Sequence, residues 1–140
     1  IDGHVLDPDF FMYCEDVDLS WRLRLLGYRI IFAPDAVVYH RLSATGGGPL
    51  ASYYVARNTL AALVKDVPGP ILRRNLARIA AQQARLLLGT LPHLREPAAR
   101  ARLRGLLAAP GLWPRMLAKR RRIQAARRVP IEAIERLLTD

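Results

Sequence analysis

The sequence predicts an α/β segment over residues 1–48 followed by a basic, mostly α-helical extension over residues 49–140. Two short runs rich in Ile, Val and aromatic residues flank Pro34-Asp35, which is typical of two strands joined by a turn. After Leu50 the apolar residues recur with helical spacing, and the charge changes from acidic to basic. A chain of 140 residues can bury one sizeable core but not two separate ones.

The first helix is expected over residues 15–26. Its apolar stripe, at i, i+4 and i+7, comprises Leu19, Leu23 and Leu26. Gly27 follows where a left-handed C-terminal cap belongs. Asp18 and Arg22 stand at i and i+4 in the favourable acid-first order, so we expect an ion pair on the helix surface.

The predicted strands cover residues 28–33 and 36–39, and His40 ends the second one. A glycine-rich loop, "RLSATGGGP", follows over residues 41–49. Loops at strand ends are favoured positions for binding groups, although a lone histidine after a strand is more often structural than a ligand.

Five further helices are predicted, and prolines separate them. They are expected over residues 51–65, 70–91, 98–108, 113–128 and 131–138. In the second of these, one side carries Leu72, Leu76, Ile79 and Leu86, and another carries Arg73, Arg74, Arg78 and Arg85. Its apolar stripe would pack on the rest of the domain, or it would bind a membrane surface, with packing slightly favoured.

Charge and cysteine content narrow the function classes. Residues 1–50 carry four arginines against seven acids, whereas residues 51–140 carry eighteen basic residues against five acids. The basic half admits contact with an anionic membrane or with nucleic acid, but no zinc-ligand spacing or aromatic stacking pattern supports specific nucleic-acid recognition. The single cysteine, Cys14, excludes an internal disulfide framework, and no apolar run is long enough for a membrane span.

The stretch "FFMYCEDVDL" places three acids directly after an aromatic run. Glu15 and Asp16 could be present only because the positive end of a helix dipole stabilises acids in the first turn. The apolar approach also suits a general base that accepts a proton from a hydroxyl, and Asp16 could play that part. Asp16 and Asp18 would not share a metal, because residues i and i+2 of a helix diverge by about 200°. Asp7-Pro8-Asp9 is too generic to indicate a metal site.

These motifs together resemble a known family. The string "LDPDFFMYCEDVDLSWRLRLLGYRIIFAPDAVVYHRLSATGG", with "YYVARN" at residues 53–58, is similar to the C-terminal part of family 2 glycosyltransferases, especially bacterial rhamnosyltransferase-like members. The resemblance covers about residues 4–60, and the basic "KRRRIQAARR" is similar to tails of such members. It implies a GT-A fold, an α/β nucleotide-sugar-binding domain with a largely parallel sheet.

The resemblance also implies roles for four residues. Asp16 would be the catalytic base of an inverting transfer from a nucleotide-diphosphate-sugar to an acceptor hydroxyl, and Glu15 would orient the acceptor or Asp16. His40 would complete a Mg²⁺ or Mn²⁺ site with an upstream D-x-D. Arg57 would contact a phosphate of the donor or of a lipid-linked acceptor, since a cation is attracted there.

The family's nucleotide-binding half has no counterpart in this sequence. We therefore expect the acceptor-side portion of an enzyme, which alone would neither bind the donor well nor turn over. The expected location is cytoplasmic, with peripheral contact at the inner face of the cell membrane, in cell-surface polysaccharide or glycolipid synthesis. The alternative function is a basic helical module that binds an anionic membrane or nucleic acid.

Overall fold

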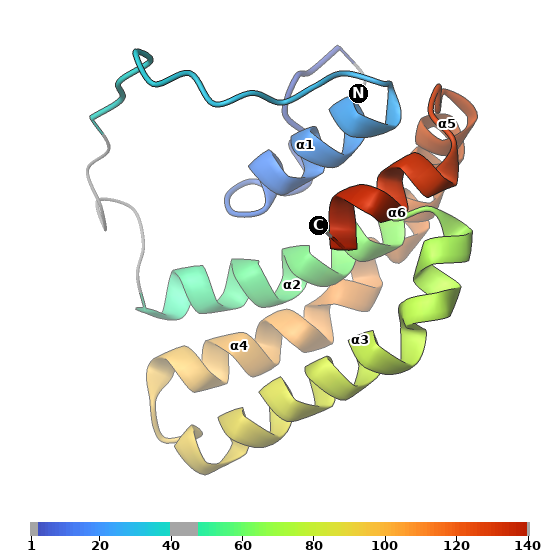
Figure 1. The fold of residues 1–140 in the computed structure, drawn as a ribbon. Coiled ribbons are helices and arrows are strands. Elements are labelled where there is room, and N and C mark those ends of the chain that lie inside the picture. The colour runs from blue at the N-terminus through green and yellow to red at the C-terminus, as the bar shows by residue number, and fades with distance from the viewer. Residues whose placement is uncertain (1–2, 40–47, 140) are drawn as a thin grey trace.

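The computed structural model describes residues 3–39 and 48–139, and the elements in these ranges are helices (Figure 1). The α-helices are α1 (Glu15–Leu25), α2 (Gly48–Asp66), α3 (Gly69–Thr90), α4 (Pro97–Ala108), α5 (Trp113–Ala125) and α6 (Ile131–Thr139). Two short 3-10 helices, η1 (Leu91–His93) and η2 (Ala109–Leu112), join α3 to α4 and α4 to α5.

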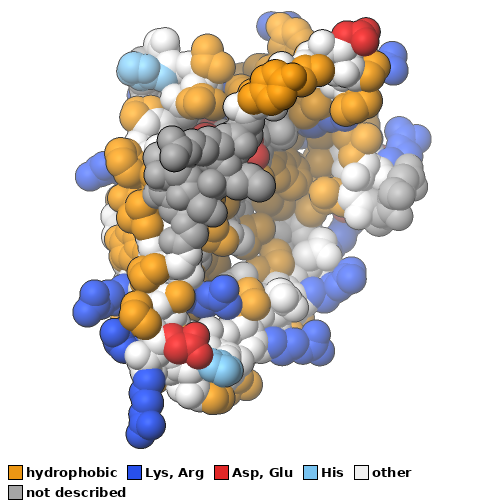
Figure 2. Space-filling view, turned by 90° about the vertical axis from the view of Figure 1, so that its left-hand side faces the viewer, with side chains coloured by type: hydrophobic (Ala, Val, Ile, Leu, Met, Phe, Trp, Pro, Cys, Tyr) orange, Lys and Arg blue, Asp and Glu red, His pale blue; other side chains and the backbone are white. Residues whose placement is uncertain are grey.

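Helix α2 is central, because α1, α4 and α5 all pack against it. Helices α2 and α4 approach each other closely at Gly105 of α4. A Cβ atom at Gly105 would lie 2.2 Å from the carbonyl oxygen of Tyr53, so only glycine fits this crossing. The α3–α4 hairpin extends to one end of the molecule, where arginine side chains gather on the surface (Figures 1 and 2).

The apolar core has two parts. The first part contains the buried side chains of Leu25, Val67, Ile71, Ile123 and Ile134. The second contains those of Phe10, Ala61, Ala62 and Met116. Each part draws residues from at least three segments, so the N-terminal segment, α2 and α5 are tied into one packed unit.

The prediction of an α/β segment, and with it a GT-A-type fold for residues 1–48, is wrong for the residues that the structure describes. Residues 28–39 run across the molecule without forming a strand (Figure 1). Phe32, Val38 and Tyr39 are 89%, 83% and 97% exposed. Strand propensity measures how well a residue fits a pleated, half-buried surface, and no second strand lies within the described ranges to provide one.

The helix predictions are confirmed to within a few residues at each end. Gly27 has φ +91°, as expected for a left-handed C-terminal cap. The predicted helix over 113–128 ends earlier, at Ala125, and the predicted helix over 51–65 begins earlier, at Gly48. His40, the expected metal ligand, lies outside the described residues, as does most of the predicted glycine-rich loop.

Candidate functional site

A backbone in an unusual conformation leads into α1. Phe11, Tyr13 and Cys14 have φ angles of 59°, 62° and 65°, in the left-handed region that side chains other than glycine rarely adopt. For bulky residues such a conformation is unfavourable and persists only when the surroundings impose it. We call residues 10–14 the left-handed turn.

Asn58 of α2 imposes this conformation. Its side chain is fully buried, and its Nδ2 donates to the carbonyl oxygens of Phe10, Met12 and Tyr13 at 2.8, 2.8 and 2.7 Å. The Sγ atom of Cys14 lies 3.8 Å from Thr59 Oγ1, one residue further along α2. One helix therefore holds the left-handed turn along most of its length.

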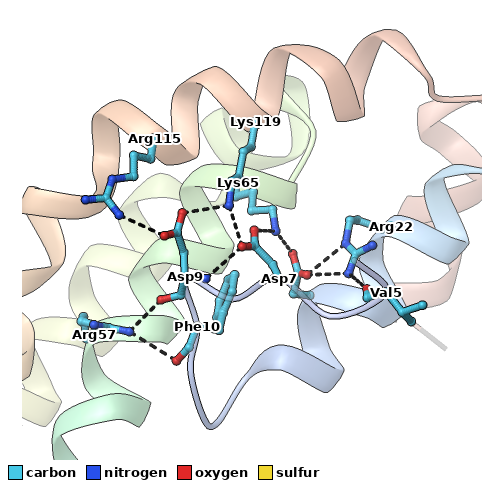
Figure 3. A network of polar contacts seen from close by, with 10 residues as sticks. Val5, Asp7, Asp9, Phe10, Arg22, Arg57, Lys65, Arg115 and Lys119 are labelled. Atoms are coloured by element: carbon cyan, nitrogen blue, oxygen red, sulfur yellow. Dashed lines mark hydrogen bonds and ion pairs between the residues drawn. The ribbon is translucent and has the colours of Figure 1, made fainter. Parts of the chain in front are cut away.

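Arg57 reinforces the same contact rather than projecting into open solvent. Its Nη2 donates to the carbonyl oxygens of Asp9 and Phe10 at 2.9 and 3.3 Å (Figure 3), and its Nε donates to Asn58 Oδ1 at 2.8 Å. The predicted contact between Arg57 and a phosphate stays a prediction. In this structure the guanidinium holds the backbone before the left-handed turn.

Glu15 and Asp16 occupy the first turn of α1, immediately after the left-handed turn. Asp16 is exposed, and its Oδ1 accepts a hydrogen bond from the Val17 amide at 2.8 Å. It lines a cavity of about 350 Å³ together with Ser20, Trp21 and residues of α6. Glu15 is half-buried, and its Oε2 atom is buried without a hydrogen-bond partner among the described residues. The two candidate catalytic acids thus follow a braced turn, one of them facing a cavity.

Asp18 has a different role from Asp16. Its Oδ2 accepts from Arg22 Nε at 2.9 Å, so the predicted i, i+4 pair is confirmed. The predicted surface location is wrong, because Asp18 is fully buried and its Oδ1 also accepts from Lys65 of α2. Helical geometry sends the two acids of this D-x-D in different directions, as expected.

A buried ion cluster lies beside the left-handed turn (Figure 3). Lys65, fully buried, donates to both Asp7 and Asp18. Lys119 of α5 donates to Asp7 at 2.6 Å and to Asp9 at 2.8 Å. Burial raises the pKa of Asp7, but hydrogen bonds from Lys119 and Lys65 outweigh it and bring that pKa down to about 2. The cluster joins the N-terminal segment, α1, α2 and α5.

Within the described ranges, Asp66, next to Lys65 in the chain, has no ion-pair partner of the kind that the other acids near Lys65 have. Its side chain is fully buried, and neither side-chain oxygen has a hydrogen-bond donor among the described residues. Burial, followed by the negative charge of Asp18, raises the pKa of Asp66 to about 9. The fold therefore favours the uncharged form of Asp66.

The described residues do not make a metal site. Within residues 3–39 and 48–139, no three His, Cys, Asp or Glu side chains gather closely enough to hold a metal ion. Asp7 and Asp9 point at lysine and arginine side chains instead, and these cations neutralise them. The Mg²⁺ or Mn²⁺ that the resemblance implies would need ligands from elsewhere.

The residues that hold the site together were missed by sequence reasoning. Asn58 belongs to the "YYVARN" motif, yet nothing in that string indicates three bonds to one turn. Lys65 and Asp66 did leave a signal, because an adjacent pair of opposite charges ends an otherwise apolar helical segment. Buried charges are almost always paired, so such residues invite a search for distant partners.

The chain was also compared with known proteins. No family model matches the chain, and neither the curated proteins nor the solved structures give a match. Separately, none of the helices in the described ranges is long and apolar enough to cross a membrane.

Proposed function

We propose that this chain provides the acceptor side of a glycosyltransferase, with Asp16 as the catalytic base. The observation that carries the proposal is an exposed carboxylate at the start of α1, facing a cavity and preceded by an unfavourable turn that Asn58 holds in place. Strained backbone of this kind is found mainly where function requires a fixed geometry.

In the proposed reaction, the Asp16 carboxylate accepts the proton of an acceptor hydroxyl. The hydroxyl oxygen attacks the anomeric carbon of a nucleotide-diphosphate-sugar, and the nucleoside diphosphate leaves with the electrons of the broken bond. A single displacement of this kind inverts the configuration. A positioned general base contributes about 10²- to 10⁴-fold to such a step.

Glu15 would assist by positioning. Glu15 is half-buried next to Asp16, so the exposed part of its carboxylate would accept a hydrogen bond from the acceptor. Donor binding is assigned to no described residue. The ligands of the divalent cation that the resemblance implies are likewise assigned to no described residue.

The test is turnover of the full-length gene product with Asp16→Asn. Release of nucleoside diphosphate would be measured with UDP-glucose, GDP-mannose and dTDP-rhamnose as donors, in the presence of a membrane extract as the acceptor source. We expect kcat to fall at least 100-fold while the KM for the donor stays within about threefold. Asp35→Asn, at an exposed turn, is the matched control and should keep full activity. Turnover of Asp16→Asn within twofold of the natural protein would exclude the base assignment.

Contact with an anionic membrane is a second candidate, and one observation on α3 favours it. Leu76 and Leu86 are 58% and 39% exposed, so part of the apolar stripe of α3 is not packed against the protein. Arg73, Arg78 and Arg85 are also exposed on this helix. A lipid-linked acceptor would bring such an enzyme to the cytoplasmic face of the cell membrane, which makes the two functions compatible. Nucleic-acid binding has no comparable support.

Sedimentation with phosphatidylglycerol vesicles tests the membrane contact. Each basic residue near an anionic surface contributes about 1 kcal/mol, so a double variant with Arg78→Ala and Arg85→Ala should bind roughly 30-fold more weakly at low salt. The control is a double variant with Arg102→Ala and Arg104→Ala on α4, which has the same net charge. Equal losses in the two double variants would mean that net charge alone, rather than α3, attracts the vesicles.

A further inference from the structure

Exposed Phe11, in the left-handed turn, contacts two half-buried tyrosines of α2, Tyr53 and Tyr54. The Phe11 and Tyr54 ring centroids are 5.4 Å apart with an interplanar angle of 39°, and Tyr53 meets Tyr54 edge-on at 5.0 Å. The Arg57 guanidinium carbon lies 4.8 Å from the Tyr54 ring centroid. We call Phe11, Tyr53 and Tyr54 the aromatic platform.

Phe11 is unusual in both exposure and backbone. Its side chain is 71% exposed, although phenylalanine gains most by burial. Its φ of 59° would suit glycine, whereas a bulky side chain is unfavourable there by about 1 kcal/mol or more. Stability of the turn therefore does not explain why a phenylalanine occupies this position.

The platform is also held rigidly. Asn58 binds the carbonyl oxygens on both sides of Phe11, at Phe10 and Met12. Arg57 binds the Phe10 carbonyl and covers the Tyr54 ring with its guanidinium. An aromatic surface fixed in this way loses little conformational entropy when a ligand packs on it.

We propose that the aromatic platform binds the pyranose ring of a sugar unit in the acceptor. This inference rests on the proposed function and deepens it, because it makes the acceptor a saccharide rather than a simple lipid or protein hydroxyl. One face of a pyranose presents several C–H groups, which pack on an aromatic ring, while its hydroxyls remain free for polar partners.

The position of the platform suits this role. Phe11 precedes Asp16 by five residues, so at most about 18 Å of extended chain separates them. A saccharide acceptor can span that distance, with one sugar unit on the platform and the reacting hydroxyl at Asp16. The nucleobase of the donor could stack on the same rings, and the experiment separates these two ligands.

The test is saturation-transfer NMR on the full-length protein with methyl glycosides. The probes are methyl α-L-rhamnopyranoside, methyl β-D-galactopyranoside and methyl β-D-glucopyranoside, with uridine 5′-monophosphate as a separate arm. We expect transfer to the ring C–H protons of at least one glycoside. Transfer to none of the glycosides, or to the uridine base alone, would overturn the proposal.

The variants assign the binding to the platform. Phe11→Ala and Tyr54→Ala should weaken glycoside binding at least tenfold, and Phe11→Tyr should retain it. Phe32→Ala removes a phenylalanine that is 89% exposed in another segment and should change nothing. Phe11→Gly is the sharpest variant, because it relieves the φ strain: it should unfold at the same or a higher urea concentration and still lose glycoside binding. Equal binding by the Phe11→Ala and Phe32→Ala variants would contradict the proposal.

Asp16→Asn separates this inference from the proposed function. It should abolish turnover but leave glycoside binding within twofold, because Asp16 is not part of the platform. If Asp16→Asn kept turnover while Phe11→Ala lost glycoside binding, the base assignment would fail and the platform would stand. Loss of binding in Asp16→Asn equal to that in Phe11→Ala would count against the platform.

Discussion

The free energy of unfolding of Asp66→Asn, relative to that of the natural protein, should increase as the pH rises from 4 to 9. Asp66 is fully buried at the end of α2, and neither of its side-chain oxygens has a donor partner among the described residues. The charged groups that act on it are Asp18 and Arg22 of α1, its neighbour Lys65, and Arg120 of α5. Asparagine has a similar shape to aspartic acid, but its side chain does not titrate in this pH range.

The size of the effect follows from the pKa of Asp66, which burial raises from 3.8 to about 9. Between these values the folded protein holds a proton that the unfolded chain releases. The protonated side chain therefore contributes full stability below pH 3.8, and this contribution is lost as the pH rises toward 9. The loss is about 1.4 kcal/mol per pH unit, which amounts to at most about 4 kcal/mol at pH 7.

Urea unfolding at pH 5, 6, 7 and 8 measures this difference directly. The free energy of unfolding of Asp66→Asn minus that of the natural protein should increase by about 1.4 kcal/mol for each pH unit. Asp35→Asn is the control, and its difference should not change with pH, because Asp35 is exposed in a turn. Parallel stability curves for Asp66→Asn and the natural protein would refute the conclusion that Asp66 is protonated in the fold.

Two further substitutions test the turn and the helix crossing. Asn58→Ala removes the donor for three carbonyl oxygens and should lower the free energy of unfolding by about 3 kcal/mol or more. The control, Asn75→Ala, loses one hydrogen bond to the Ile71 carbonyl and should lower it by about 1 kcal/mol. Equal losses of the two variants in urea unfolding would contradict the conclusion that Asn58 holds the left-handed turn. Gly105→Ala should destabilise the protein by about 1–3 kcal/mol, because the new Cβ would meet the Tyr53 carbonyl oxygen at 2.2 Å. Gly89→Ala, with open space around it, should stabilise α3 by up to about 1 kcal/mol. If thermal unfolding shifted both variants in the same direction, the α2–α4 contact would be looser than described.

Helical periodicity, proline positions and one glycine cap were enough to predict the helices from the sequence. They succeeded because these signals act within a few residues of each other. The strands over 28–33 and 36–39 failed for the opposite reason. Their Ile, Val and aromatic residues favour a sheet, but a strand forms only against a partner, and the described chain offers none.

The candidate site was predictable only in part, because the contacts that hold it join residues far apart in the sequence. The position of Asp16 at a helix start follows from its immediate neighbours. The bracing by Asn58 joins residues more than forty positions apart, and Lys119 reaches Asp7 across more than a hundred. Periodicity cannot reveal such contacts, although a lysine next to an aspartate in an apolar helix does indicate that buried partners exist.

The two acids of Asp16-Val17-Asp18 have different surroundings: Asp18 is buried and ion-paired, whereas Asp16 is exposed at a cavity. The inward acid, Asp18, is fixed by Arg22 within α1 and by Lys65 from α2, so the rotation of α1 about its own axis is determined. The outward acid, Asp16, therefore faces its cavity in one orientation, while Asn58 fixes the turn that precedes it. If Asp16 is the proposed base, holding it from both sides means that it needs little rearrangement before it accepts a proton. On the proposed function, Lys65→Met should therefore lower kcat, measured as nucleoside diphosphate release, because it removes the contact from α2 that fixes Asp18, although Lys65 itself is fully buried.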